Sequence, residues 1–349
     1  MKNKELIVCF FGRYDPNYSR SRTLVLGLKE NGANIIECRT ELKGVIKYFD
    51  LIKKHWKIRK EYDVLLVAFP GWHAAILSRF LTRKLIIFDA LVSIYDSTVF
   101  DRKNTKKEGL KAKYFWFTDW LSCKLVDKVI LDTDEHINYF VQEFGLKKEK
   151  FVKVLLGTDT RFFKPKPIIK NTKFIIQHQG NIVPLQGVIF ILEAARLLED
   201  NKDIQFNIVS SRIKRTHEKK GFLNVNFIND VLYEKLPDYI SQADLCLGIF
   251  GDTNKTQRVI PHKVYEYVSM KKPVITADTP AVRELFNDDD LYLVPAANPQ
   301  ELAKAILKLK ADRELREKLA QNSYNKFMQK CTLETLGKEL VKIINEIQS

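Results

Sequence analysis

The segment Ile260–Thr276 contains the residues best suited to hold a phosphorylated ligand. A polar loop leads into a short helical pattern, and a Lys271-Lys272-Pro273 turn separates that pattern from an apolar strand. The free N–H groups and the dipole of a helix N-terminus attract phosphate. Glu266 lies about one turn inside this helix, where a carboxylate can accept hydrogen bonds from the hydroxyls of a ribose. An ordinary helix-to-strand turn of an α/β protein is the alternative.

The loop between Gln179 and Val188 is a second candidate phosphate site. A strand pattern ends before this loop, and a helical pattern begins after Gly187. Glycine lets the backbone approach a ligand closely, and the helix that follows offers another N-terminus. Because many loops of this kind are only turns, the loop supports the first segment without identifying a ligand by itself.

Together, the two segments resemble the donor-nucleotide signature of glycosyltransferase family 4, whose members share the GT-B fold of two facing Rossmann-like domains. In that family a G-(R/N)-x-x-x-x-K-G stretch supplies an Arg and a Lys to the donor diphosphate. Asn181 and Gln186 stand at those two positions here, and neither is cationic. Either another cation binds the diphosphate, or binding relies on backbone N–H groups, or the chain has lost the activity.

The resemblance also implies a pair of Glu residues separated by seven positions, the first meeting the donor sugar and the second the ribose. Glu266 takes the second position, but Arg258 takes the first. Arg258, Lys255 and Lys263 are therefore candidates to bind the diphosphate, since an Arg can hold phosphate through two N–H groups. Lys255 and Arg258 could equally be solvated loop charges. The donor contacts that the resemblance implies come from Gly12, Arg13, Asn181, Gln186, Gly187, His262, Lys263 and Glu266.

The loop Phe11–Arg22 follows the first predicted strand, and open α/β sheets bind ligands at such strand ends. Family 4 usually has a pair of glycines in this loop, close to the donor phosphates. Only Gly12 is present, and Arg13 follows it. Arg20 and Arg22 would add positive charge for an anionic acceptor, unless the loop is an ordinary charged surface.

Two carboxylates follow another predicted strand end. Asp89 and Asp96 stand in the region where many family 4 members have a His close to the reacting sugar. The resemblance therefore makes Asp89, Asp96 and Arg258 the catalytic candidates. Asp89 could instead cap the helix that follows it.

The chain lacks the residue spacings typical of metal sites. Asp132-Thr133-Asp134 has the D-x-D spacing that holds a divalent cation in the other large class of glycosyltransferases, but the cap and first turn of a helix explain it better. The six His show no zinc-ligand spacing. We therefore expect no metal and no cofactor, with a nucleotide diphosphate sugar as co-substrate.

Apolar runs of strand length alternate with helical patterns along the chain, which predicts parallel sheets covered by helices. Roughly six strands fall in each half, so we expect two doubly wound domains of the GT-B type facing a central cleft. A Pro- and Lys-rich segment, 157–172, separates them and resembles the family 4 hinge. We expect an acceptor-side domain (1–165), a nucleotide-sugar domain (166–330) and a terminal segment (331–349) that crosses back to the first domain.

The positive charge is concentrated in the first half. The net charge is +15, and the first 165 residues carry 31 Lys or Arg against 20 Asp or Glu. Unless the whole proteome is basic, this charge predicts an anionic partner such as phospholipid, a lipid pyrophosphate or nucleic acid. Residues 45–60 form a basic amphipathic pattern with Phe49, Ile52 and Trp56 at helical spacing, and residues 114–117 add an aromatic cluster. The aromatic stripe belongs either to the core or to a contact with an anionic membrane.

The sequence also suggests where the protein works. It has no run of eighteen apolar residues that would span a membrane, and its start indicates a first strand and not a signal peptide. The five cysteines are scattered without a C-x-x-C pair, as expected for reduced, buried thiols. We therefore expect a cytoplasmic protein, peripheral on the inner face of the cell membrane.

The resulting hypothesis is a retaining, metal-independent glycosyltransferase. It would move a sugar from a nucleotide diphosphate sugar, with UDP as the commonest base, to a lipid-linked, polysaccharide or other cell-envelope glycan acceptor. One alternative is a sugar-nucleotide 2-epimerase of the same fold, whose set of carboxylates and a His we cannot locate here. The other is a basic nucleic-acid-binding protein, but no binding motif is recognisable, so we expect no nucleic-acid partner.

Overall fold

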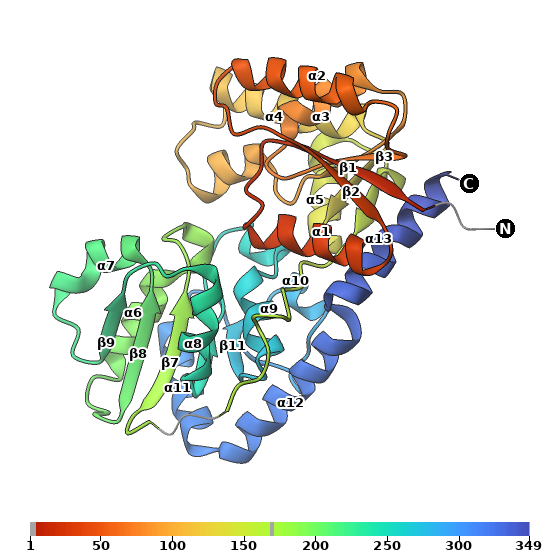
Figure 1. Ribbon diagram of the computed structural model, residues 1–349. Coiled ribbons are helices and arrows are strands. Elements are labelled where there is room, and N and C mark those ends of the chain that lie inside the picture. The colour runs from red at the N-terminus through yellow and green to blue at the C-terminus, as the bar shows by residue number, and fades with distance from the viewer. Residues whose placement is uncertain (1–4, 168–170, 349) are drawn as a thin grey trace. The chain divides into compact units, whose positions relative to one another are not determined.

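The structure is a computed structural model that describes residues 5–167 and 171–348 (Figure 1). The chain divides into two compact units, residues 5–157 with 332–348 and residues 158–331. The segment 158–165, expected to close the first domain, belongs to the second unit. Residues 1–4, part of the predicted start without a signal peptide, and residues 168–170 of the predicted hinge lie outside the described residues.

The first unit contains a six-stranded sheet in the order β2-β1-β3-β4-β5-β6, in which all neighbouring strands are parallel. Parallel strands need a crossover connection, and a helix lies in each connection of this sheet. The strands are β1 (Ile7–Gly12), β2 (Asn34–Arg39), β3 (Val64–Val67), β4 (Leu85–Asp89), β5 (Lys128–Leu131) and β6 (Phe151–Lys153).

The helices of this unit are α1 (Ser19–Glu30), α2 (Ile46–Ile58), α3 (Trp72–Leu81), the π-helical turn η1 (Asp96–Asp101), α4 (Leu110–Leu125), α5 (Asp134–Phe144), η2 (Lys148–Lys150) and α13 (Leu333–Gln348). Successive strand residues point to opposite faces of a sheet. Val8 and Phe10 accordingly pack with α1 and α13, whereas Cys9 and Phe11 pack with α2, α3, α4 and α5. Both faces of the sheet are therefore buried.

The second unit repeats this architecture with the strand order β12-β11-β10-β7-β8-β9, again all parallel. The strands are β7 (Phe174–Gln179), β8 (Ile204–Val209), β9 (Val225–Ile228), β10 (Leu245–Leu247), β11 (Val274–Ala277) and β12 (Tyr292–Val294). The helices are α6 (Val188–Leu197), α7 (Ser211–His217), α8 (Leu236–Ser241), α9 (His262–Ser269), α10 (Pro280–Arg283), α11 (Pro299–Ala311), α12 (Arg313–Lys330) and the short turns η3 (Pro184–Gln186), η4 (Glu218–Lys220), η5 (Tyr233–Lys235) and η6 (Thr256–Arg258).

The predicted architecture of two doubly wound parallel sheets with six strands each is confirmed. The sequence patterns did not predict α7, because it buries only Ile213 and His217 and so has little apolar periodicity. All five cysteines are free and buried, as predicted. Within residues 5–167 and 171–348, no helix has both the length and the apolar character required to span a bilayer.

The hinge-like segment after Gly157 is anchored within the second unit. The side chain of Asp159 is buried and accepts two hydrogen bonds from the guanidinium of Arg161. Phe163 is also buried, and its ring centroid lies 4.9 Å from that of Tyr233. Asp159 and Phe163 therefore hold the start of the second unit in place.

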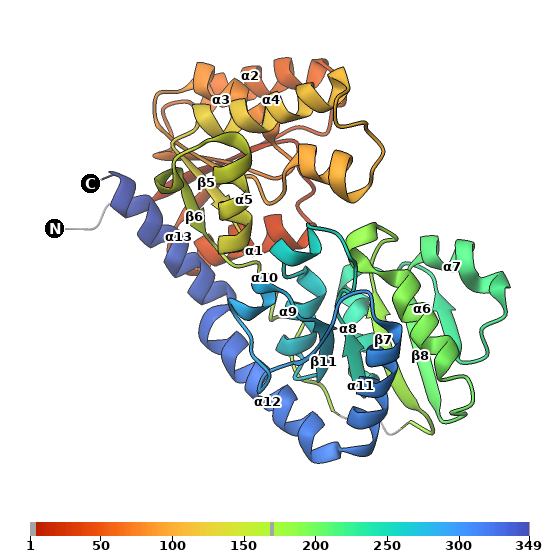
Figure 2. The ribbon, with the colours of Figure 1, turned by 180° about the vertical axis from the view of Figure 1, so that it is seen from behind.

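The last helix, α13, returns to the first unit and packs against α1 (Figures 1 and 2). The two helices cross at Gly27 and Gly337. A Cβ atom on Gly337 would lie 1.8 Å from the carbonyl oxygen of Gly27, which is far inside the van der Waals limit. Only glycine permits this approach of the two backbones, and it brings Leu336 and Leu340 into the core beneath α1.

We predict that Gly337→Ala destabilises the first unit by about 1–3 kcal/mol, because the added methyl group forces α13 away from α1. All four tryptophans lie in this unit, so their fluorescence during urea unfolding reports its stability. Lys338→Ala, at the exposed neighbouring position, is the control and should leave the unfolding midpoint unchanged. An unchanged midpoint for Gly337→Ala would contradict the tight crossing.

Candidate active site

The second sheet has its topological switch point between β7 and β10, the central neighbours from which the strand order runs outward in both directions. Ligands of open α/β sheets bind at the carboxyl ends of the strands at this point. The loop after β7 leads through η3 to α6, and the loop after β10 leads through η6 to α9. Both sequence segments that predicted phosphate binding therefore meet at one place.

Five polar side chains gather there, and we call them the switch-point cluster: His178, Gln179, Gln186, Lys263 and Glu266. The Nε2 amide of Gln179 donates a hydrogen bond to Oε2 of Glu266 at 2.7 Å. The ammonium of Lys263 donates to Oε1 of Gln186 and lies 3.5 Å from Nε2 of His178. Gln186 occupies the position at which the family has a diphosphate-binding Lys. Lys263 of α9 therefore places a cation beside Gln186, where the loop itself has none.

Burial controls the ionisation of this cluster. It raises the pKa of Glu266 to about 7, although the amide of Gln179 and the charge of Lys263 oppose this effect. It also lowers the pKa of Lys263 to about 7, and Glu266 offsets only part of that shift. The pKa of His178 is well below its usual value because of burial and the neighbouring Lys263. A neutral His178 can donate from Nδ1 to the carbonyl oxygen of Leu247, 3.2 Å away.

Glycines bring the two loops of the site into direct contact. The N–H groups of Phe250 and Gly251 donate to the carbonyl oxygens of Gln186 and Leu185, both at 3.2 Å. Gly187 has φ +64°, and a Cβ there would lie 2.4 Å from the carbonyl carbon of Phe250. The absence of a side chain at Gly187 thus serves loop packing at the edge of the predicted phosphate site.

The remaining predicted donor residues of the second unit lie around this cluster. Arg258, on η6, and His262, the first residue of α9, are half-buried, and Asn181 is exposed in the loop after β7. Lys255 is buried, so its interpretation as a solvated loop charge is wrong. Sequence reasoning did not single out Gln179 or His178, and the only signal was the polar Gln177-His178-Gln179 end of an otherwise apolar strand.

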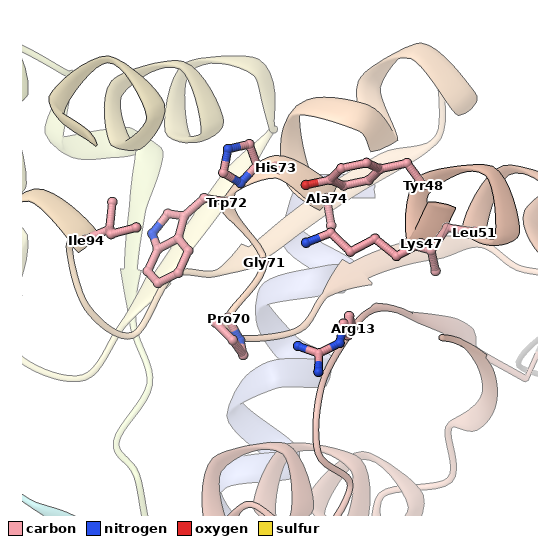
Figure 3. Close-up of a pocket in the computed structure, with 10 residues that line it drawn as sticks. All are labelled: Arg13, Lys47, Tyr48, Leu51, Pro70, Gly71, Trp72, His73, Ala74 and Ile94. Atoms are coloured by element: carbon pink, nitrogen blue, oxygen red, sulfur yellow. The ribbon is translucent and has the colours of Figure 1, made fainter. Parts of the chain in front are cut away.

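The first sheet has its switch point between β1 and β3, and a cavity of about 230 Å³ opens beside it (Figure 3). Gly12 ends β1 with φ +134°, a conformation that favours glycine, and Arg13 follows it at the cavity. Figure 3 shows Arg13 and Lys47 reaching into the cavity on the side opposite Trp72. The other lining residues are Tyr48, Leu51, Pro70, Gly71, His73, Ala74 and Ile94.

Asp89 lies in the interior of the first unit, paired with Arg20. The Nε and Nη2 atoms of Arg20 donate to Oδ1 of Asp89 at 3.0 and 2.9 Å, and both side chains are almost completely buried. Arg20 also donates from Nη1 to the carbonyl oxygens of Val154 and Leu155. The expectation that Arg20 offers charge to an acceptor is wrong. Asp89 does not cap a helix, and this closed pair argues against its catalytic role.

Asp96 is buried at the start of η1. The preceding turn is fixed by Asp119, which accepts hydrogen bonds from Oγ of Ser93 at 2.7 Å and from the N–H groups of Ile94 and Tyr95. Burial raises the pKa of Asp119 to about 7 despite these hydrogen bonds. Sequence reasoning missed Asp119, whose only signal was a carboxylate inside an aromatic helix.

The D-x-D segment forms the start of α5, as predicted. The side chain of Thr133 accepts a hydrogen bond from the N–H of His136 and caps the helix. Asp132 contacts Nδ1 of the same His at 2.9 Å, and Asp134 pairs with Lys153. In the part of the chain that the structure describes, no group of three or more His, Cys, Asp or Glu is arranged to hold a metal ion.

Comparison with known proteins identifies the second unit. Residues 159–326 match the family model described as Glycosyl transferases group 1. Residues 159–326 therefore form a domain of the group 1 glycosyl transferase type. A curated relative, the Alpha-D-kanosaminyltransferase of Streptomyces kanamyceticus, is 27% identical over 181 residues, which are 50% of this chain and 46% of the relative. The chain thus aligns with about half the length of that relative.

Solved structures show that both units together have the GT-B fold. The Anabaena protein Alr3699/HepE in complex with UDP-glucose is 14% identical, with 98% of this chain and 100% of that chain covered and a TM-score of 0.73. Sucrose-phosphate synthase from Thermosynechococcus elongatus is also 14% identical, covers 99% of both chains and has a TM-score of 0.76. The predicted fold is confirmed, and the family match of residues 159–326 supports the predicted glycosyltransferase class.

We predict that Arg20→Ala lowers the unfolding free energy of the first unit by about 3–5 kcal/mol, because it leaves the Asp89 carboxylate buried without its cation. Tryptophan fluorescence during urea unfolding measures this loss, and Lys29→Ala on the exposed side of α1 is the control. The structural role would be refuted if Asp89→Asn abolished sugar transfer while leaving the unfolding midpoint unchanged.

Proposed function

We propose that this protein transfers a sugar from a nucleotide diphosphate sugar, with UDP as the nucleotide, to a glycan or lipid-linked acceptor. The observation that carries the proposal is the switch-point cluster, which places a buried carboxylate, Glu266, and a buried ammonium, Lys263, on one short helix of the group 1 domain. The solved relative HepE binds UDP-glucose, which supports UDP as the donor base.

In the proposed donor complex, Glu266 accepts hydrogen bonds from the ribose hydroxyls while Gln179 holds the carboxylate in place. Lys263 binds the diphosphate beside Gln186, with Arg258 and the N-terminus of α9 as further positive groups. Asn181, Gly187 and His262 would border this site. The cluster therefore offers an alternative to the loop cations that the sequence lacks.

The proposed reaction breaks the bond between the anomeric carbon and the diphosphate oxygen and forms a bond to an acceptor hydroxyl, with retention of configuration. Negative charge develops on the leaving diphosphate, and Lys263 and Arg258 are the groups that would stabilise it. Because these cations belong to the protein, we propose that the transfer does not depend on a metal. The acceptor hydroxyl gives its proton to the departing diphosphate oxygen as the new bond forms.

We propose that the acceptor binds in the cavity of the first unit. Arg13 and Lys47 provide positive charge for an anionic group, and Trp72 and Tyr48 provide ring faces for a sugar. A lipid-linked acceptor would bring the protein to the inner face of the cell membrane. Asp96 is buried and Asp89 is paired, so neither lines this cavity.

The proposal is tested by thermal unfolding of the purified protein with UDP, GDP, ADP, CMP and dTDP, each with and without EDTA. A ligand that binds only the native state raises the melting temperature. A shift with UDP that EDTA does not change supports the donor site, and a shift with another diphosphate would correct the base. No shift with any of them would favour loss of activity.

We predict that Glu266→Gln weakens UDP binding and sugar transfer by about ten- to a hundredfold, because a hydrogen bond to a charged group contributes about 1.5–3 kcal/mol. Uridine binding should fall by the same factor, since the lost contact is to the ribose. Isothermal titration with UDP and uridine measures both effects. Glu193→Gln, on the exposed side of α6, is the matched control, and equal affinities in the two variants would remove Glu266 from the site.

We also predict that the affinity for UDP falls by roughly tenfold from about pH 7 to about pH 9. The pKa of Lys263 is lowered to about 7 in the free protein, so the ammonium loses its proton over this range and no longer attracts the diphosphate. Lys263→Met should bind UDP weakly at every pH, whereas Lys219→Met, changed at an exposed lysine, should retain the pH dependence. A pH-independent affinity in the unmodified protein would contradict this role.

A further inference from the structure

The helical layer of α2, α3 and α4 in the first unit exposes several large apolar side chains. Phe49 and Trp56 are 67% and 65% exposed, so the interpretation of this aromatic stripe as core is wrong. Large contiguous apolar patches are rare on soluble proteins and mark docking surfaces. We call this surface the α2–α4 face, and its apolar members are Val45, Ile46, Phe49, Ile52, Trp56, Phe80, Leu110, Tyr114 and Phe117.

Val45, just before α2, and three exposed apolar side chains of α2 form one stripe. Val45, Phe49, Ile52 and Trp56 follow the spacing i, i+4, i+7 and i+11, which keeps them on the same side of a helix over about 16 Å. The residues that α2 buries, Leu51 and His55, belong to another side of the helix. On α4, the exposed residues Leu110, Tyr114 and Phe117 repeat the spacing. The core is therefore filled without these stripes.

Aromatic contacts link the three helices that carry these exposed side chains. The rings of Tyr48 on α2 and His73 on α3 are 6.4 Å apart, and the rings of His73 and Tyr114 on α4 are 6.1 Å apart. His73 Nε2 and the hydroxyl of Tyr114 also share a hydrogen bond of 2.6 Å. Both views of the ribbon show α2, α3 and α4 side by side on one face of the first unit (Figures 1 and 2).

The charge around this face is strongly positive. Residues 43–60 contain seven Lys or Arg and one acid, Asp50, which pairs with Lys54. Residues 102–113 contain six Lys or Arg and one acid. Lys53 and Lys57 are exposed and directly follow Ile52 and Trp56. Cations therefore border the apolar stripe along its length.

We infer that the α2–α4 face docks the protein on an anionic lipid surface. A bilayer interface accepts both kinds of group at once, since aromatic rings enter the boundary between headgroups and acyl chains while lysines reach the lipid phosphates. The charge complementarity favours an anionic bilayer over a neutral one. The inference rests on the proposed function only in that a membrane-borne acceptor gives the protein a reason to bind a membrane. Vesicle binding tests the inference without any measurement of sugar transfer.

The test is flotation of the purified full chain with phosphatidylglycerol–phosphatidylcholine vesicles and with phosphatidylcholine vesicles alone. We expect binding to the anionic vesicles that weakens as salt rises above about 0.15 M, where the screening length is about 8 Å. The double variants Phe49→Ser/Trp56→Ser and Lys53→Glu/Lys57→Glu should each lower partitioning by about tenfold or more. Leu223→Ser/Leu232→Ser and Lys219→Glu/Lys220→Glu make equivalent changes at exposed positions of the second unit and should bind as the unmodified protein does.

A spectroscopic measurement distinguishes the loss of a membrane contact from the unfolding of a variant. Vesicles of brominated anionic lipid should quench tryptophan fluorescence in the unmodified protein, and Trp56→Phe should bind equally well while losing most of that quenching. Absence of binding to anionic vesicles at low salt would overturn the inference, as would unchanged partitioning of both α2 variants. A dimer in sedimentation equilibrium that Phe49→Ser/Trp56→Ser converts to a monomer would assign the face to a second copy of the chain instead.

Discussion

Lys263 and Glu266 are ionisable groups that the second unit keeps away from water, and much of the local sequence makes this possible. Each buried polar group needs a hydrogen-bond partner, and two amide side chains, Gln186 and Gln179, provide them. An amide satisfies an ammonium without neutralising it, so the positive charge of Lys263 stays available to an anion. The loops must also pack closely around the pair, and Gly187 permits this. In this site, uncharged amide side chains therefore surround two ionisable side chains that remain available to a ligand.

The first unit also buries an ionic pair, near the end of strand β4, but this pair has the opposite effect on ligand binding. Arg20 and Asp89 satisfy each other through two N–H groups, and the remaining donor atom of Arg20 binds backbone carbonyl oxygens. No charge from this pair is left for a ligand, so the pair stabilises the fold. Ligand binding in this unit is better suited to the cavity beside Arg13 and Lys47. The two units thus share one architecture but use buried charge differently.

Helix α2 borders three different environments, because its residues point to different sides of the helix. Leu51 and His55 face the core, Lys47 and Tyr48 border the cavity, and Phe49 and Trp56 remain exposed. A helical repeat of 3.6 residues distributes neighbouring positions over all sides of the helix. A single basic amphipathic segment can therefore contribute to the fold, to a binding cavity and to an outer surface at once.

The sequence alone determined the features that depend on near neighbours. The alternation of strands and helices, the cap at Thr133, the helix that begins at Leu333 and the position of Glu266 inside α9 all follow from patterns a few residues long. Tertiary structure decided which charges meet. Arg20 reaches Asp89 across 69 positions, and Gln179 reaches Glu266 across 87.

Tertiary structure also decided which side of α2 stays exposed, because periodicity describes a stripe without saying whether another element covers it. The physical reason is the same in each case. The role of a charged or apolar side chain depends on its burial and its partner, and both are set by segments far away in the chain.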